Sequence, residues 1–80
     1  MYTDAMRRAV HSLDGHGPKG FNLQIVDNEY FLSVRASEAS FMRLGDSEKR
    51  QAVEYMVKIK KALEDNGAVV LLVREGGKEL

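Results

Sequence analysis

The residues best suited to chemistry lie in and around a glycine-rich segment near the start of the chain. Gly15–Gly20 reads GHGPKG and matches the letters of the dinucleotide-binding fingerprint G-x-G-x-x-G. That fingerprint holds a pyrophosphate only where a strand precedes it and a helix follows it, because the helix N-terminus then faces the phosphates. Here a helix is expected before the segment and a strand after it, and Pro18 lacks a main-chain N–H. We therefore interpret 15–20 as a helix-ending loop.

The sequence gives equally little support for a metal site or a catalytic nucleophile. His11, Asp14 and His16 are close in sequence, but their spacing matches no metal-binding motif, and the chain contains no cysteine. The serines and threonines lie mostly at expected helix caps and turns, where they bond the main chain. The carboxylates fall on expected helix faces and turns, where solvated carboxylates are ordinary. We therefore expect no enzyme, no metal, no cofactor and no small-molecule substrate.

Length and composition restrict the class of protein. Eighty residues are enough for one hydrophobic core, so we expect a single domain over 1–80 with a frayed tail at 75–80. Twelve basic and twelve acidic residues give zero net charge, which removes the simple electrostatic case for a nucleic acid or membrane partner. The longest apolar run, 68–73, is too short to span a bilayer. Together with the absence of cysteine, this favours a cytoplasmic protein outside the membrane.

Because the net charge is zero, nucleic-acid binding would require a local basic patch. Arg7 and Arg8, with Lys19 and Arg35, would form one if the first helix lay near the hairpin, and Phe31 shares a strand face with Arg35. Nucleic-acid binding needs basic side chains beside aromatic or base-reading groups. Nearby acidic residues make a solvated surface the simpler interpretation. Nucleic-acid binding is therefore kept as the alternative function.

Two helices are predicted from apolar spacing. Residues 3–13 repeat apolar side chains every three or four positions, and Thr3 is a good N-cap. A longer helix begins at Asp46 or Ser47 and ends at Asn66-Gly67. Its apolar stripe, which we expect to face the core, consists of Ala52, Met56, Ile59 and Leu63.

Two strands between these helices predict a hairpin. Apolar and polar residues alternate over 21–25 and over 30–35, the period of half-buried strands. A two-residue turn at Asp27 and Asn28 would place apolar residues opposite each other on one face. The pairs predicted by that turn are Ile25 with Tyr30, Leu23 with Leu32, and Phe21 with Val34.

The strand after the long helix, Ala68–Arg74, is apolar on both sides. A strand, a crossover helix and a second strand predict a parallel relation between the second and third strands. We expect an α+β, two-layer domain with element order α-β-β-α-β. Its three-stranded mixed sheet is predicted in the strand order 2-1-3, with both helices on one face.

The second face of that sheet is the candidate binding surface. We expect Val69, Leu71 and Val73 to face the helices, which leaves an apolar patch on the other side that is large enough for a partner. The residues predicted for partner binding are Val26, Phe31, Val70 and Leu72. Alternatively, Ser37–Leu44, as a loop or a short helix, folds across that face and closes the core. The sequence thus favours a protein-interaction module, homodimeric or bound to another protein, that acts as a regulator, inhibitor or accessory subunit.

Overall fold

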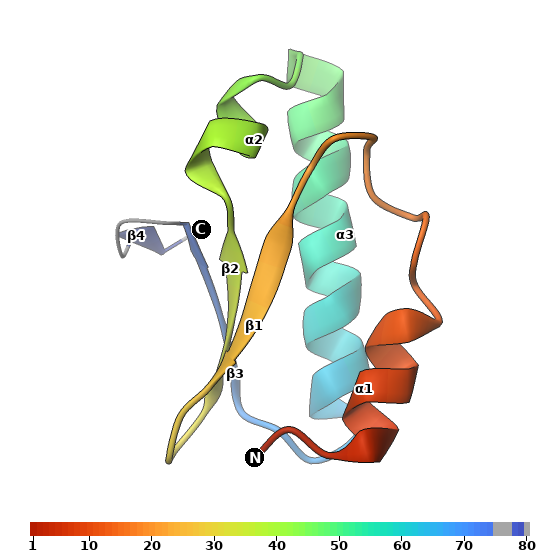
Figure 1. The fold of residues 1–80 in the computed structure, drawn as a ribbon, viewed down its shortest axis with the longest axis vertical. Helices are drawn as coiled ribbons and strands as arrows, with labels where there is room; N and C mark the ends of the chain where they lie inside the picture. The colour runs from red at the N-terminus through yellow and green to blue at the C-terminus, as the bar shows by residue number, and fades with distance from the viewer. Residues whose placement is uncertain (75–77, 80) are drawn as a thin grey trace.

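The computed structural model describes residues 1–74 and 78–79 of the chain. Two helices pack on one face of a mixed sheet, and a short helix lies beyond the end of β2 (Figure 1). The elements are α1 (Asp4–His11), β1 (Leu23–Asp27), β2 (Leu32–Ala36), α2 (Glu38–Met42), α3 (Asp46–Glu64), β3 (Val70–Arg74) and β4 (Lys78–Glu79). The α+β fold class and the order α-β-β-α-β are confirmed, with α2 and the two-residue β4 as additions. The rest of the tail expected to fray, 75–77 and 80, lies outside the described residues.

The two predicted helices form as their sequences indicate. In α1 the Thr3 hydroxyl accepts a hydrogen bond from the Met6 main-chain N–H at 3.1 Å, which satisfies one donor of the first turn. The apolar stripe of α3 is fully buried; the helix ends at Glu64, two residues before the predicted Asn66, and Gly67 in the following turn adopts a φ of +93°. The Ala68 N–H then donates to the Leu63 carbonyl at 3.1 Å and turns the chain toward the sheet.

The hairpin forms with a register different from the predicted one. Ile25 lies opposite Val34 and Leu23 opposite Ala36, a shift of four positions from the expected pairs. The cause is a longer turn, in which the Asn28 N–H donates to the Phe31 carbonyl and the Asn28 side chain accepts from the Tyr30 N–H. A shift of an even number keeps each strand residue on its face, so Leu23, Ile25 and Val34 still face the helices. Tyr30, expected in the core, is 78% exposed in the turn.

The predicted strand order 2-1-3 is wrong, because β3 pairs with β2 and not with β1. The order is β1-β2-β3-β4, and β2 and β3 are parallel as expected, with Leu32 opposite Val70 and Val34 opposite Leu72. The N–H of Leu32 donates to the Val69 carbonyl at 2.8 Å, which holds the two strand starts together. β2 is therefore the central strand of the α/β core, and its residues facing α3 are completely buried.

The segment Ser37–Leu44, left open between loop and helix, contains the short helix α2. The Ser37 side chain accepts from the Ser40 N–H, as an N-cap does. The buried Ser40 hydroxyl accepts from the Asn22 N–H at 3.0 Å and so ties α2 to the chain entering β1. Phe41 is buried and meets the Phe21 ring edge to face, with ring centroids 6.2 Å apart.

Candidate interaction surface

The sheet has one face covered by α1 and α3 and a second face that we name the open face. Because alternate strand residues point to opposite sides, the ladder places on the open face Gln24, Val26, Ser33, Arg35, Leu71 and Val73. Phe31 and Val69 extend this surface beyond the starts of β2 and β3. Val69 is 65% exposed and Leu71 is 36% exposed, whereas Val70 between them is buried. The apolar part of the face, which we name the open-face patch, consists of Val26, Phe31, Val69, Leu71 and Val73.

Only half of the predicted partner-binding set lies on this surface. Val26 and Phe31 are half-buried on the open face, as expected. Val70 is 4% exposed and Leu72 packs against the helix-facing core, so the predicted placement of both residues is wrong. The residues that prediction assigned to the helices, Val69, Leu71 and Val73, are on the open face instead.

The two faces of β3 were assigned the wrong way round because its sequence has no alternation of apolar and polar residues. Five consecutive apolar residues carry no alternation, so either phase of β3 would bury apolar side chains. The phase is set by the path from α3: Ala68 bonds back to the helix end and packs against the core, so Val70, two residues later, points to the same side and is buried. Knowledge of the Leu32–Val70 pairing would have identified the exposed set.

The short helix α2 does not cover the open face. Figure 1 shows it past the end of β2, beside the N-terminal part of α3. Its buried residue Phe41 packs with Phe21, which contacts the helix-facing core. Met42 is exposed, and Leu44 is half-buried. The alternative in which 37–44 closes the core across that face is therefore wrong for the described structure.

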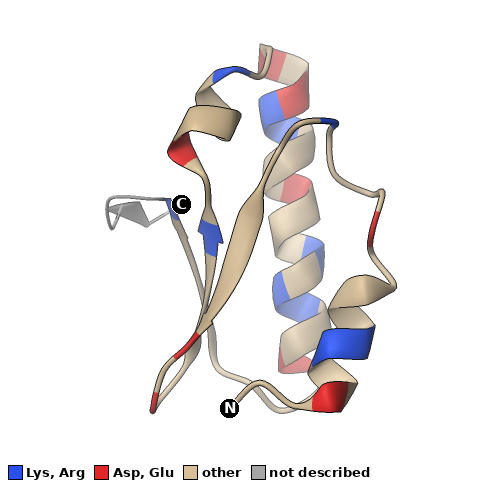
Figure 2. Ribbon diagram, viewed as in Figure 1, with Lys and Arg blue, Asp and Glu red and all other residues tan. Residues whose placement is uncertain are grey.

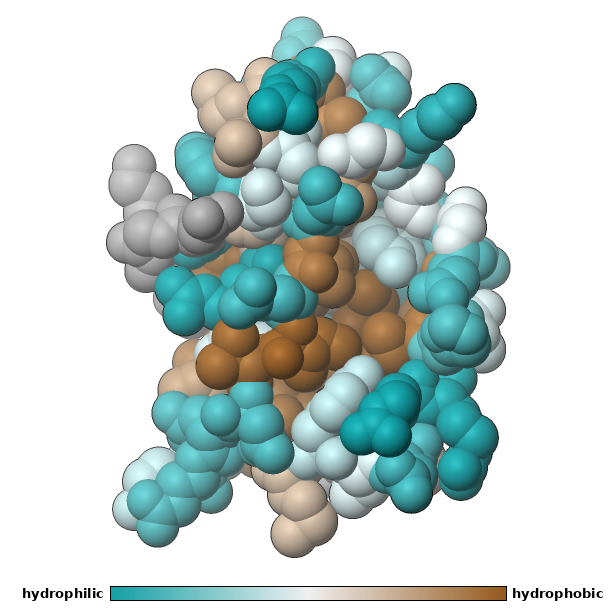
Figure 3. Space-filling view, viewed as in Figure 1, coloured by the Kyte–Doolittle hydropathy of each residue, from teal (hydrophilic) through white to brown (hydrophobic). Residues whose placement is uncertain are grey.

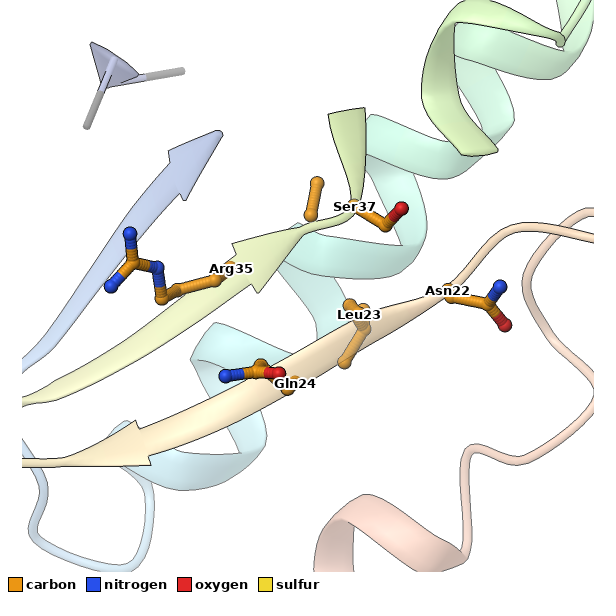
Figure 4. A pocket seen from close by; sticks show the side chains of 6 residues that line it. Asn22, Leu23, Gln24, Arg35 and Ser37 are labelled. Atoms are coloured by element: carbon orange, nitrogen blue, oxygen red, sulfur yellow. The ribbon is translucent and has the colours of Figure 1, made fainter. Parts of the chain in front are cut away.

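The open face becomes polar where β1 begins and β2 ends. A hollow of about 460 Å³ is lined there by Asn22, Leu23, Gln24, Arg35, Ala36 and Ser37. Figure 4 shows Gln24 and Arg35 extending from paired positions of β1 and β2, with Asn22 and Ser37 farther along the strands. Arg35 forms no ion pair with any residue of 1–74. Its guanidinium can therefore bind a carboxylate or carbonyl oxygen supplied from outside.

A second arginine, Arg74 on β3, already bonds a carboxylate within the chain. The Arg74 Nε donates to a Glu38 carboxylate oxygen at 2.9 Å, and its terminal nitrogen bonds the other oxygen, in a two-pronged pair. The same guanidinium lies 5.4 Å from the centre of the Phe41 ring. Hydrogen bonding to Glu38 raises the pKa of Arg74 further. This cluster joins the end of β3 to α2.

The four basic residues of the nucleic-acid alternative are not gathered on one surface. Figure 2 shows basic positions on α1, in the loop before β1 and on β2 at separate places, with acidic positions among them. Arg7 bonds Asp4 at 3.0 Å and lies over the Tyr2 ring, and Arg8 is exposed on the same helix. Lys19 lies in the loop, and Arg35 is on the open face. The structure therefore gives this alternative no joint patch.

The glycine-rich loop has a packing role. A Cβ added to Gly17 would lie 2.7 Å from a carbon of the Tyr55 ring, so only glycine allows the loop to lie this close to α3. Burial raises the pKa of Tyr55, with a smaller contribution from Asp14. His11 Nδ1 lies 2.8 Å from an Asp14 carboxylate oxygen, and both side chains are exposed. Within residues 1–74 and 78–79, no three metal-ligating side chains converge.

Comparisons with protein-family models, curated proteins and solved structures found no match to this chain. Among the described helices, none has the length and apolarity needed to cross a bilayer. The candidate site is therefore defined by its own geometry, an apolar patch on a sheet face that no described helix covers, continuing into a polar hollow containing Arg35.

Proposed function

We propose that this chain is a non-enzymatic, cytoplasmic protein-interaction module that acts as a small regulator, inhibitor or accessory subunit. Its binding surface is the open face. The observation that carries the proposal is the exposure of Val69 and Leu71 beside three further apolar residues on a sheet face that no described element covers. Burying such a patch against another protein removes apolar surface from water, at about 25 cal/mol per Å².

The chemistry of the face indicates the kind of protein that fits it. The partner presents apolar side chains to the open-face patch and a carboxylate to Arg35, which forms no ion pair within residues 1–74. Gln24 and Ser33, beside Arg35 and Leu71 on the sheet, supply hydrogen-bonding groups at the border between the two regions. This arrangement of an apolar centre and a polar rim is typical of protein interfaces.

A matched pair of valines tests the proposal. Val69→Lys places a charge in the open-face patch, whereas Val57→Lys places one on α3, where Val57 is 50% exposed and away from the patch. We expect Val69→Lys to reduce hydrophobic-dye binding and to abolish capture of a protein that wild-type chain and Val57→Lys both retain. Arg35→Glu should weaken the same capture. Equal dye binding and equal capture by wild type and both valine variants would overturn the proposal.

A further inference from the structure

The two sides of the three-stranded core sheet differ in whether a further strand pairs with them. The outer side of β3 pairs with β4, with Val73 opposite Glu79 and Arg74 opposite Lys78. No described strand lies along the outer side of β1. β1 is the strand nearest the viewer in Figure 1, and Figure 3 shows, in the same view, apolar surface across the middle of the molecule over β1 and toward the helices. This edge is both unpaired and apolar.

The hydrogen-bonding groups of this edge can be assigned from the hairpin. The Asn22 carbonyl accepts from the Ser37 N–H, and the Asn28 N–H donates to the Phe31 carbonyl. Because partners alternate along an antiparallel ladder, the even-numbered residues of β1 point their main-chain groups toward β2. Leu23 and Ile25 therefore point their N–H and C=O groups outward, and no described residue hydrogen bonds to those outward groups. Such an edge is a template for another strand.

The charges along the edge determine which strand fits it. Charged side chains and proline normally protect exposed edges, but none lies between Lys19 and Asp27. The edge is thus basic at its start and acidic at its end. Lys19 lies in the turn before β1, where the Phe21 N–H donates to the Pro18 carbonyl and Gly20 has a φ of +83°. A second copy running antiparallel brings this turn of each chain toward Asp27 of the other, whereas a parallel copy would align like charges. Lys19 has no ion pair within residues 1–74.

The apolar side chains select one antiparallel register. When Leu23 lies opposite Leu23 of the second copy, Phe21 meets Ile25, and the turn that carries Lys19 lies beside Asp27. Moving the second copy by two positions places Phe21 opposite Asp27 in one direction and Ile25 opposite the turn at Lys19 in the other, so either move leaves fewer apolar pairs. Asp27 already accepts from the N-terminal ammonium at 2.8 Å and from the Tyr2 N–H at 3.0 Å, which leaves lone pairs for a further donor.

From this combination we propose that two copies of the chain pair antiparallel along β1, about a two-fold axis at Leu23. The pairing continues the sheet from one copy into the other and joins their open faces into one surface. It uses an edge rather than a face, so it does not rest on the proposed function.

Sedimentation equilibrium of the full chain with charge-exchanged variants tests this dimer. Lys19→Glu and Asp27→Lys each create two like-charge contacts across the axis, and each should raise the dimer Kd roughly tenfold. An equimolar mixture of the two variants restores both contacts as attractive pairs, so it should dimerise about as well as wild type. Restoration by mixing identifies an antiparallel pairing in trans, which no effect within one chain reproduces. Circular dichroism checks that each variant is folded.

A main-chain variant provides the second measurement. Leu23→Pro removes an outward N–H without removing a bond to β2, and it should abolish the dimer, whereas Leu23→Ala removes the same side chain but keeps that N–H. Val69→Lys lies off the edge and should leave the dimer intact. A strictly monomeric wild type would overturn the proposal, and so would a dimer that Val69→Lys breaks or that survives Leu23→Pro. Failure of the mixture to dimerise better than either variant alone would also overturn it.

Discussion

The two faces of the sheet are made from alternate residues of the same strands but have opposite surroundings. On β2, Leu32, Val34 and Ala36 face α3 and are buried, whereas Ser33 and Arg35 between them lie half-buried on the open face. On β3 the contrast is between surroundings alone, because both sets are apolar. On β2 the residue type therefore indicates which face a residue occupies. On β3 the residue types are the same on both faces, and only the position decides whether a side chain is buried or exposed.

Two adjacent valines give the largest expected difference between the faces. Val70→Lys puts a charge among buried apolar side chains, and it should lower the free energy of unfolding by about 4 kcal/mol. Val69→Lys, one residue earlier and 65% exposed, should change it by less than about 0.5 kcal/mol. Urea unfolding followed by circular dichroism measures both. Equal losses would contradict the assignment of the two faces.

Two leucines measure the same contrast without introducing charge. Leu32→Ala leaves a cavity under α3, because Leu32 is 1% exposed, and it should cost about 3 kcal/mol of unfolding free energy. Leu71→Ala removes the same atoms from the open face and should cost less than about 1 kcal/mol. If the Leu71 variant proved the less stable of the two, the open face would have to be covered in solution.

The smallest expected effect concerns Asp27, an exposed residue at the end of β1. Hydrogen bonding to the N-terminal ammonium holds the pKa of this carboxyl below its usual value. Its stabilising contribution is therefore present above the unfolded carboxyl pKa of about 3.9 and is lost as pH falls through the lower folded value. Unfolding free energies measured from neutral to acidic pH should fall less for Asp27→Asn than for wild type. High salt should reduce the difference.

Local features account for what could be predicted from the sequence. The stripe of α3 was identified correctly because helical spacing, an acidic first turn and a terminal Asn-Gly all indicate the same boundaries. Thr3 was identified as a cap because its hydroxyl acts within the first turn. The helix-facing residues of β1 survived a wrong register, because a four-position shift preserves a two-residue period.

The candidate site was only partly predictable because it depends on long-range pairing. Asn28 at the turn favours local bonding to Tyr30, and the resulting longer turn moved Tyr30 out of the core. Nothing local shows whether β3 joins β1 or β2, since both neighbours present similar apolar rows. Val26 and Phe31 were placed correctly because their strands alternate, and Val70 and Leu72 were not because theirs does not.

By itself the sequence determined that α1, α3 and three strands form, that Leu23, Ile25, Leu32 and Val34 face the core, and that β3 carries more apolar surface than one face can bury. Tertiary structure alone decided that β2 is central, that Val70 and not Val69 lies beneath α3, and that no described strand pairs with the outer side of β1. The physical reason is range. Caps, helical stripes and strand alternation act over a few residues, whereas strand order and phase depend on how α3 delivers β3 to the sheet.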